Sequence, residues 1–197
     1  MYKLGLTGGI ATGKSTVSDY LRQQNIPVID ADAVSHDVLN TDQRVLTDLR
    51  ETFGDNIFID GKLSRPQLGK IVFGNLKALD KLNKITHPRI FERINEIAEE
   101  LALAGNTFIV YDLPLLLESP SPVTFDGIMV VTTNADHQLK RLMARNNLSP
   151  EDAQKRIDSQ MPIAEKVKLA DFVIDNDGSI DETYNQVQQV LEQITHA

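Results

Sequence analysis

The sequence predicts an α/β fold in which a mostly parallel, five-stranded sheet carries helices on both of its faces. The first observation is that short aliphatic and β-branched runs recur along the chain, as is typical of strands covered on both sides. The second is that segments with helical periodicity separate these runs, and alternation of strand and helix produces a parallel sheet. The third is a glycine-rich loop at residues 8–15, between the first strand and the first helix.

Each strand of this sheet corresponds to one short apolar run. The runs are Tyr2–Leu6, Pro27–Asp30, Thr107–Asp112, Gly127–Thr132 and Phe172–Asp175. Between them, apolar residues recur at intervals of three and four, which is the spacing of one helix face. We therefore expect helices after the first strand, in the middle of the chain and at its C-terminal end.

Two helical segments do not fit the simple alternation. Residues 36–105 separate the second strand from the third, and we interpret them as a helical insertion that binds an acceptor. Residues 135–170 precede the last strand, and we interpret them as a helical lid. Both belong to a single domain at 1–197, and helical padding without a role is the alternative for each. The pair His87-Pro88 interrupts the long helical pattern of the insertion and predicts a bend of the chain there.

The composition excludes several classes of protein. A net charge of -8 argues against a general nucleic-acid binder, which needs a basic surface. No apolar run approaches the ~18–20 residues that span a bilayer, and the start MYKLGLTGG has no signal-peptide pattern. The sequence contains no cysteine, which fits a reducing compartment. We therefore expect a cytoplasmic protein without a membrane or nucleic-acid partner.

The predicted lid is basic, in contrast to the whole chain. Residues 136–168 contain seven basic and five acidic side chains, which favours a small anionic ligand there. Arg141 and Arg145 are spaced i, i+4 on one predicted helix face. Guanidinium groups on a mobile lid could close over phosphates and stabilise charge in a transition state. A solvated helical surface is the alternative interpretation.

The loop GGIATGKS at 8–15 fits the phosphate-binding pattern G-x-x-x-x-G-K-[ST] in full. It also has the required context, because it follows a predicted strand and precedes a predicted helix. Glycines let backbone N–H groups turn inward around phosphates, and the helix N-terminus adds further donors. The fold is thus predicted to be a three-layer P-loop NTPase fold that binds a nucleoside triphosphate. The residues expected against the phosphates are Gly9, Ala11, Thr12 and Gly13.

Two side chains that follow the loop have separate predicted tasks. Lys14 reaches the β- and γ-phosphates, and the hydroxyl of Ser15 ligates Mg²⁺. Position 11 is alanine, which tolerates fewer backbone conformations than glycine, but the sequence gives no evidence that φ must be positive there. We therefore expect nucleotide binding with alanine at this position.

Aspartates close two of the predicted strands. Asp32 follows the second strand, and Asp112 ends the third, at the sheet edge where α/β proteins bind ligands. We predict that Asp32 accepts the proton of the acceptor hydroxyl or orients that hydroxyl. Asp112 is expected near the metal, as a carboxylate that acts through water. A turn or a helix cap is the alternative for each aspartate.

These motifs favour a small kinase over a switch or a motor. A GTPase needs N-K-x-D after a late strand, but this chain has VVTTNADH there, without a suitably spaced lysine. The segment after Asp112 reads DLPL rather than D-x-x-G. A motor generally needs a larger chain and a basic track. A P-loop, a helical insertion and an arginine-bearing lid are the parts of a small P-loop kinase.

Several segments resemble the dephospho-CoA kinase family, in the family's order and over nearly the whole chain. They are LTGGIATGKSTV, DADAVSH, SRPQLGKIVF, ITHPRI, DLPLLLE, QLKRLMARNNLSPEDAQKRIDSQ and ADFVIDNDGS. The resemblance implies that ATP phosphorylates the ribose 3′-hydroxyl of dephospho-CoA to give coenzyme A and ADP, with Mg²⁺ required.

The resemblance also implies roles for individual residues. Lys14, Ser15 and Thr16 would hold ATP and Mg²⁺, and Asn176 would lie near the adenine. Asp32 would lie at the 3′-hydroxyl, and Arg141 and Arg145 would be lid arginines. Residues bordering the acceptor would be His87, Asp112, Pro114, Leu115, Leu116 and Glu118.

Two other hypotheses stay open from the residues alone. One is a kinase of another small metabolite, which differs only in its acceptor. The other is a nucleotide-binding regulator that changes partners and shows no acceptor-dependent turnover. Under the leading hypothesis the partners are small molecules only, and we expect a monomer or a weak homo-oligomer.

Overall fold

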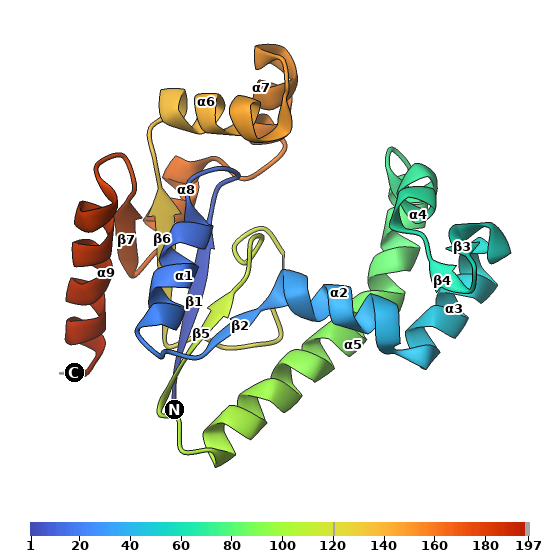
Figure 1. Cartoon of the computed structure of the whole chain (residues 1–197), viewed down its shortest axis with the longest axis horizontal. Helices are drawn as coiled ribbons and strands as arrows, with labels where there is room; N and C mark the ends of the chain where they lie inside the picture. The colour runs from blue at the N-terminus through green and yellow to red at the C-terminus, as the bar shows by residue number, and fades with distance from the viewer. Residues whose placement is uncertain (120, 196–197) are drawn as a thin grey trace. The chain divides into compact units, whose positions relative to one another are not determined.

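The computed structural model of the protein describes residues 1–119 and 121–195 (Figure 1). The chain divides into two compact units, one made of Met1–Val28 with Ala104–Ala197 and the other of Ile29–Leu103. Among the described residues, no helix is long and apolar enough to cross a membrane.

The main sheet has five strands in the order β2-β5-β1-β6-β7. The strands are β1 Tyr2–Gly8, β2 Val28–Asp30, β5 Phe108–Asp112, β6 Gly127–Thr132 and β7 Phe172–Asp175. β1 is parallel to both β5 and β6, with Leu4 opposite Val110 and Gly127, and β6 is parallel to β7. The mostly parallel, five-stranded sheet predicted from the sequence is confirmed.

One face of this sheet is covered by α1 Lys14–Gln23 and α9 Ile180–Thr195. The alternation of side chains along β1 places Leu4 and Leu6 in the same fully buried cluster. Residues of both helices complete this cluster, namely Val17, Leu21, Val187, Val190 and Leu191. The sheet and the two helices therefore share one hydrophobic core.

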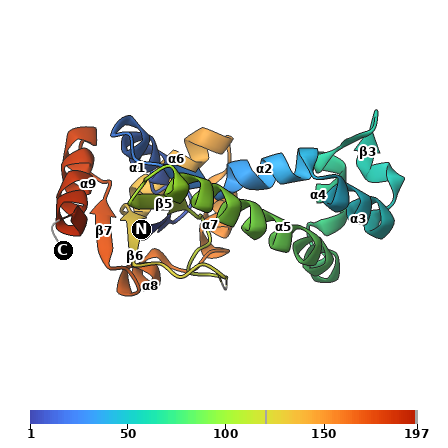
Figure 2. The ribbon, with the colours of Figure 1, turned by 90° about the horizontal axis from the view of Figure 1, so that it is seen from below.

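The opposite face is covered by α8 Ile163–Lys168, which packs against β6. Figure 2 shows α1 and α8 on opposite sides of the sheet. The segment after β5 also contributes, because a Cβ atom at Gly5 would lie only 2.6 Å from Cδ2 of Leu116. The predicted helices on both faces are thus confirmed. α6 Ala135–Asn146 and α7 Pro150–Asp158 precede α8, so the segment interpreted as a lid is helical.

The second unit is mainly helical, as the sequence predicts for 36–105. Its helices are α2 Ala31–Thr41, α3 Gln43–Phe53, η1 Asp55–Ile57, α4 Arg65–Val72 and α5 Leu76–Leu103. Asp42 caps α3 by accepting hydrogen bonds from the N–H groups of Arg44 and Val45, and it pairs with Arg89 of α5 at 2.8 Å. Burial raises the pKa of Asp42, but these N–H donors and Arg89 outweigh burial and hold the pKa below its ordinary value.

α5 continues through His87 and Pro88, so the bend predicted there does not end the helix. One feature of this unit differs from the prediction. A short antiparallel hairpin, β3 Phe58–Ile59 and β4 Lys62–Leu63, lies within the predicted helical insertion. Its turn residues Asp60 and Gly61 both have positive φ, as a two-residue hairpin turn requires.

Candidate active site

The phosphate loop connects the C-terminal end of β1 to the first turn of α1. Gly13 has φ +96°, and no side chain caps α1. The first N–H groups of the helix are therefore not used by a capping side chain. A side chain at position 13 would collide with Asn176, because a Cβ atom there would lie 1.8 Å from Nδ2. Position 13 therefore requires glycine for two reasons: the positive φ of the backbone and the lack of space for a Cβ atom beside Asn176.

Ala11 corrects the expectation drawn from the sequence. Its φ is +60°, so the loop does need a left-handed residue at this position and has an alanine there. For a residue with a Cβ atom, this conformation costs about 1–2 kcal/mol. Such strain persists only where the surroundings hold it, and loops that bind ligands are typical places for it.

The loop separates its donors from its acceptors. Its carbonyl oxygens accept hydrogen bonds, for example Gly9 O from Thr12 within the loop and Thr12 O from Asn176 outside it. The N–H groups of Ala11, Gly13, Lys14 and Ser15 donate no hydrogen bond to the described residues. Successive N–H groups that have no protein acceptor form an anion-binding concavity, and the positive end of α1 adds to it.

Lys14 forms an ion pair with Asp112, at the C-terminal end of β5. The side chain of Asp112 is only 4% exposed and that of Lys14 is 20% exposed. The two predicted site residues are therefore brought together directly. The structure gives Asp112 a lysine partner, where the sequence suggested a carboxylate near a metal.

Asn176 follows β7 and is buried against the loop. Its Nδ2 donates to Thr12 O at 2.8 Å, and its Oδ1 accepts from the Thr183 hydroxyl at 3.0 Å. Its carbonyl oxygen accepts from Arg141 of α6 at 2.9 Å. The side-chain amide of Asn176 therefore supports the phosphate loop.

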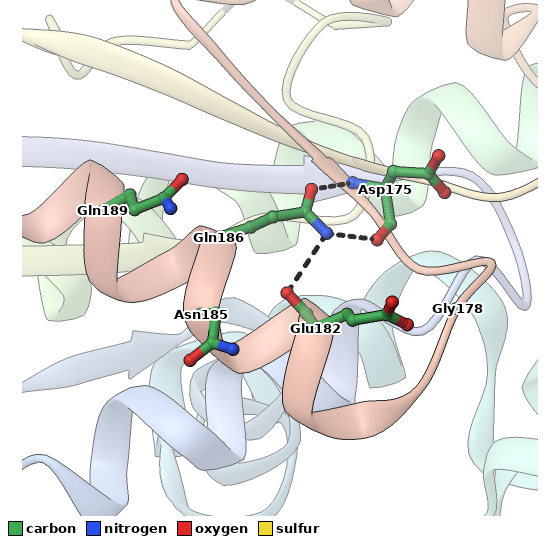
Figure 3. A pocket seen from close by; sticks show the side chains of 6 residues that line it. All are labelled: Asp175, Gly178, Glu182, Asn185, Gln186 and Gln189. Carbon is green, nitrogen blue, oxygen red and sulfur yellow. Dashed lines mark hydrogen bonds between the residues drawn. The ribbon is translucent and has the colours of Figure 1, made fainter.

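The strand end that carries Asn176 is anchored by Gln186 of α9 (Figure 3). The Gln186 amide accepts from the N–H of Asp175 and donates to the Asp175 carbonyl, both at 2.8 Å. The surface hollow around it is lined by Asp175, Gly178, Glu182, Asn185, Gln186 and Gln189. None of these residues was predicted as a site residue, and their observed contribution is to hold the β7 end.

Asp177, next to Asn176, forms a polar cluster with the segment before α6. Its carboxylate accepts from the Thr133 hydroxyl at 2.5 Å, from the Asn134 N–H at 2.7 Å and from the His137 ring at 3.2 Å. The Thr133 hydrogen bond is the largest of the effects that lower the pKa of Asp177 to about 2. This cluster connects the β6 and β7 ends.

The two lid arginines differ in their surroundings. Arg141 is half-buried and donates to the Asn176 carbonyl and to the Thr133 hydroxyl. Arg145 is exposed, and its Nε donates to the side chain of its neighbour Asn146. The two share α6, as the sequence predicted, but only Arg141 is tied to the loop after β7.

The segment after β5 holds the residues expected to border the acceptor. The carbonyl of Pro114 accepts from the Thr7 hydroxyl at 3.0 Å, and Leu116 is buried while Leu115 is 47% exposed. Glu118 pairs with Lys166 of α8 at 2.5 Å. Leu116 and Glu118 thus pack inward, and Leu115 faces outward.

Asp32 and His87 belong to the second unit. Asp32 is exposed in the first turn of α2, while Asp30 caps that helix by accepting from the Ala33 N–H at 3.0 Å. His87 is exposed on α5 and packs edge-on against Phe91. Asp32 is thus not the cap that the alternative interpretation allowed.

Sequence reasoning missed three side chains that contact the loop. Lys166 is fully buried and donates to the Gly8 carbonyl at 3.0 Å, while Gln138 and Gln160 bind the backbone of Ile10. The signal for Lys166 was its position, because with Ile163 and Val167 it completes an i, i+3, i+4 apolar face. No comparable signal distinguishes the two glutamines from surface residues.

The fold and the loop define the class of this protein, which is a P-loop kinase. The sequence profile of the dephospho-CoA kinase family matches residues 2–182, and the chain belongs to that family. The resemblance described from the sequence is therefore confirmed.

Individual relatives agree with this assignment. A dephospho-CoA kinase of Latilactobacillus sakei is 51% identical, over 99% of this chain and 96% of its own length. That of Carboxydothermus hydrogenoformans is 48% identical, over 96% and 92%. A crystal structure from Thermus thermophilus matches with a TM-score of 0.82 and 31% identity, covering 98% of this chain and 97% of the other. A dephospho-CoA kinase structure from Campylobacter jejuni has a TM-score of 0.74 at 34% identity, covering 98% and 96%.

Proposed function

We propose that the protein transfers the γ-phosphoryl group of ATP to the ribose 3′-hydroxyl of dephospho-CoA, giving coenzyme A and ADP. The observation that carries this proposal is the family match over residues 2–182, which includes the whole phosphate loop. The separation of donors and acceptors in that loop supports the binding of a nucleoside triphosphate.

On the donor side, the loop from Gly9 to Thr16 holds the phosphates. Backbone N–H groups at Ala11 and Gly13 face the β-phosphate, and Lys14 exchanges Asp112 for the β- and γ-phosphates. A fixed array of donors stabilises charge on the transferred group without reorganising during the reaction. Asn176 supports the loop through its hydrogen bond to the Thr12 carbonyl, and the adenine is expected near this residue.

Ser15 is the residue that would hold Mg²⁺. Its side chain is exposed at the start of α1, and Mg²⁺ in kinases is bound by few protein groups together with phosphate oxygens and waters. The described residues contain no group of three or more His, Cys, Asp or Glu side chains suited to a metal, which agrees with such a sparse site. The ion would neutralise charge on the β- and γ-phosphates.

On the acceptor side, Asp32 accepts the proton of the attacking hydroxyl or orients it. Its exposed carboxylate forms no hydrogen bond or ion pair within the described part of the chain, so it can take a ligand. We propose the acceptor border as predicted from the resemblance, with His87, Asp112, Pro114, Leu115, Leu116 and Glu118. The inward packing of Leu116 and Glu118 makes them supports of that border.

The lid at 135–170 supplies Arg141 and Arg145 to the phosphates. Arg145 is the more available of the two, because it is exposed and paired only with the side chain next to it within the described residues. Closure of a basic lid would exclude water and so favour transfer to the acceptor over hydrolysis. We also propose a cytoplasmic location and a monomer or weak homo-oligomer, which sedimentation would test.

The test is ADP release from ATP with Mg²⁺ in parallel reactions containing dephospho-CoA, AMP, shikimate or no acceptor. We expect turnover with dephospho-CoA only, and coenzyme A as the product. Turnover with another acceptor would keep the kinase and change its substrate. A lack of acceptor-dependent turnover would favour the nucleotide-binding regulator.

A further inference from the structure

The backbone of Ile10, at the apex of the phosphate loop, is bonded on both sides by glutamine side chains far away in the sequence. Its N–H donates to Oε1 of Gln160 at 2.8 Å. Its carbonyl accepts from Nε2 of Gln138, also at 2.8 Å. Each glutamine uses the end of its amide that its backbone partner requires.

The two glutamines come from different parts of the lid. Gln138 lies on α6 and is only 6% exposed, and Gln160 follows the end of α7. Gln138 also fills the space beside Gly9, because a Cβ atom there would lie 2.9 Å from Nε2. These are close, specific contacts of a buried side chain, and they distinguish Gln138 from the solvated lid surface.

These hydrogen bonds fix the direction of two peptide groups. A trans peptide is planar, so its carbonyl and its N–H point in opposite directions. When Gln138 holds the Ile10 carbonyl, the Ala11 N–H of the same peptide must point to the other side. When Gln160 holds the Ile10 N–H, the Gly9 carbonyl points away from it, toward Thr12, which donates to it through both its N–H and its hydroxyl.

The Ala11 N–H is one of the donors without an acceptor among the described residues, and Ala11 is the left-handed alanine of the loop. An ordinary conformation at Ala11 would require the peptide before it to rotate. The Gln138 hydrogen bond opposes that rotation. It therefore holds a strained residue in the one arrangement that presents its N–H to the phosphate side.

We propose that Gln138 and Gln160 are positioning residues that orient the two peptides around Ile10, so that the Ala11 N–H faces the phosphates of the bound nucleotide. The proposal rests on nucleotide binding in the proposed function, and it does not depend on the acceptor. Through the backbone of the loop, α6 and the end of α7 would then affect phosphate affinity separately from the arginines of α6.

One substitution, made at both positions, tests the proposal. Gln138→Glu replaces a donor with an acceptor opposite a carbonyl, so the hydrogen bond is lost and the two oxygens repel each other. Gln160→Glu keeps an oxygen that accepts the Ile10 N–H. Both variants add the same negative charge beside the same residue, so their difference reports the polarity of the hydrogen bond.

Titration calorimetry with ADP and with adenosine, in the absence of any acceptor, gives the measurement. We expect the ADP Kd to rise about tenfold more in Gln138→Glu than in Gln160→Glu, as for a polar group left without its partner. Adenosine has no phosphate, so its Kd should change equally in both. The matched control is Gln154→Glu on the exposed surface of α7, where ADP affinity should stay within about twofold, because an exposed charge there is screened.

Equal losses of ADP affinity in the two variants, or the reverse order, would overturn the proposal. It would also be overturned if Gln138→Glu lost as much affinity for adenosine as for ADP. If Gln138→Glu does not fold, Gln138→Leu removes the donor without a charge and must still lose ADP affinity relative to Gln160→Glu. A variant pair that behaves as expected in a protein without dephospho-CoA turnover would reject the proposed function alone. Normal turnover and normal ADP affinity in both variants would reject this inference alone.

Discussion

The groups around the phosphate loop differ from two of the residues assigned to the acceptor, Asp32 and His87. Asn176, Lys166 and Gln138 are all buried, and each binds a backbone oxygen of the loop. Asp32 and His87 of the second unit are exposed, and Asp32 forms no hydrogen bond with other described residues. The loop is thus held by other groups of the protein, whereas the Asp32 carboxylate is open to a ligand. Substitutions in these two surroundings should therefore differ in effect, and the loss of Lys14 should have the largest effect.

Replacement of Lys14 by alanine removes the charged side chain of the loop that the proposed function assigns to the phosphates. We expect kcat to fall by about 10³-fold, the order found when a preorganised transition-state donor is removed. Steady-state ADP release measures the effect, and Lys155→Ala on the exposed surface of α7 is the control. Activity close to that of the parent protein would show that the loop has been misassigned.

Replacement of Lys166 by methionine tests the buried support of the loop. The variant leaves Glu118 without its cation, and the loss of one partner of a buried pair costs about 3 kcal/mol of the free energy of unfolding. Urea denaturation measures it. Lys168→Met, two residues further along and exposed, should change stability by less than about 0.5 kcal/mol. If the two variants are equally stable, the ion pair does not support the fold.

Under the proposed function, replacement of Asp32 by asparagine should lower kcat by about 10²-fold, because the acceptor hydroxyl would lose the carboxylate that accepts its proton or orients it. Thermal stability and ATP affinity should stay unchanged, since the Asp32 side chain forms no hydrogen bond with other described residues. Asp37→Asn, exposed on the same helix, is the control. A large loss of stability in Asp32→Asn would contradict the contrast itself.

Asp177 gives a prediction about pH. Its pKa is about 2 in the folded protein, below the ordinary value of 3.8, so the stabilisation is present above pH ~4 and is lost as the pH falls toward 2. Asp177→Asn should therefore lower Tm at pH 6, and the difference from the parent should shrink as the pH approaches 2. Asp48→Asn, exposed on α3, should show no such trend. A difference that is constant with pH would rule out the carboxylate as its source.

The smallest expected effect belongs to Ala11. Glycine there relieves the left-handed strain but loosens the unfolded chain, which leaves a net stabilisation of about 0.5 kcal/mol. Ala144→Gly, exposed on α6, should instead destabilise the protein by about 0.5–1 kcal/mol. Opposite signs in chemical denaturation would confirm that the loop holds a strained alanine.

The elements predicted well from the sequence are those with a strong local signal. The inner strands β1, β5 and β6 are largely buried on both faces, and all five strands are short apolar runs whose limits could be read within about two residues. The hairpin at 58–63 was missed because two-residue strands carry no periodicity, although Asp60-Gly61 is a hairpin signal by itself. The pair His87-Pro88 predicted a bend within a helical segment, and the structure places Pro88 inside the continuous helix α5.

The site shows the same division. The phosphate loop, Lys14 and Asp112 follow from motif and strand order, and the structure joins the last two. The φ of Ala11, the buried state of Lys166 and the hydrogen bonds of Gln138 and Gln160 depend on residues more than a hundred positions apart, which no local pattern records.

The ion pair between Lys14 and Asp112 has a kinetic consequence. A buried carboxylate that occupies the lysine in the free enzyme competes with the nucleotide for the same cation. Under the proposed function, breaking this pair offsets part of the binding free energy of ATP, and the pair re-forms as ADP leaves. Asp112 would therefore lower the affinity for both the substrate ATP and the product ADP, which favours rapid turnover over tight binding.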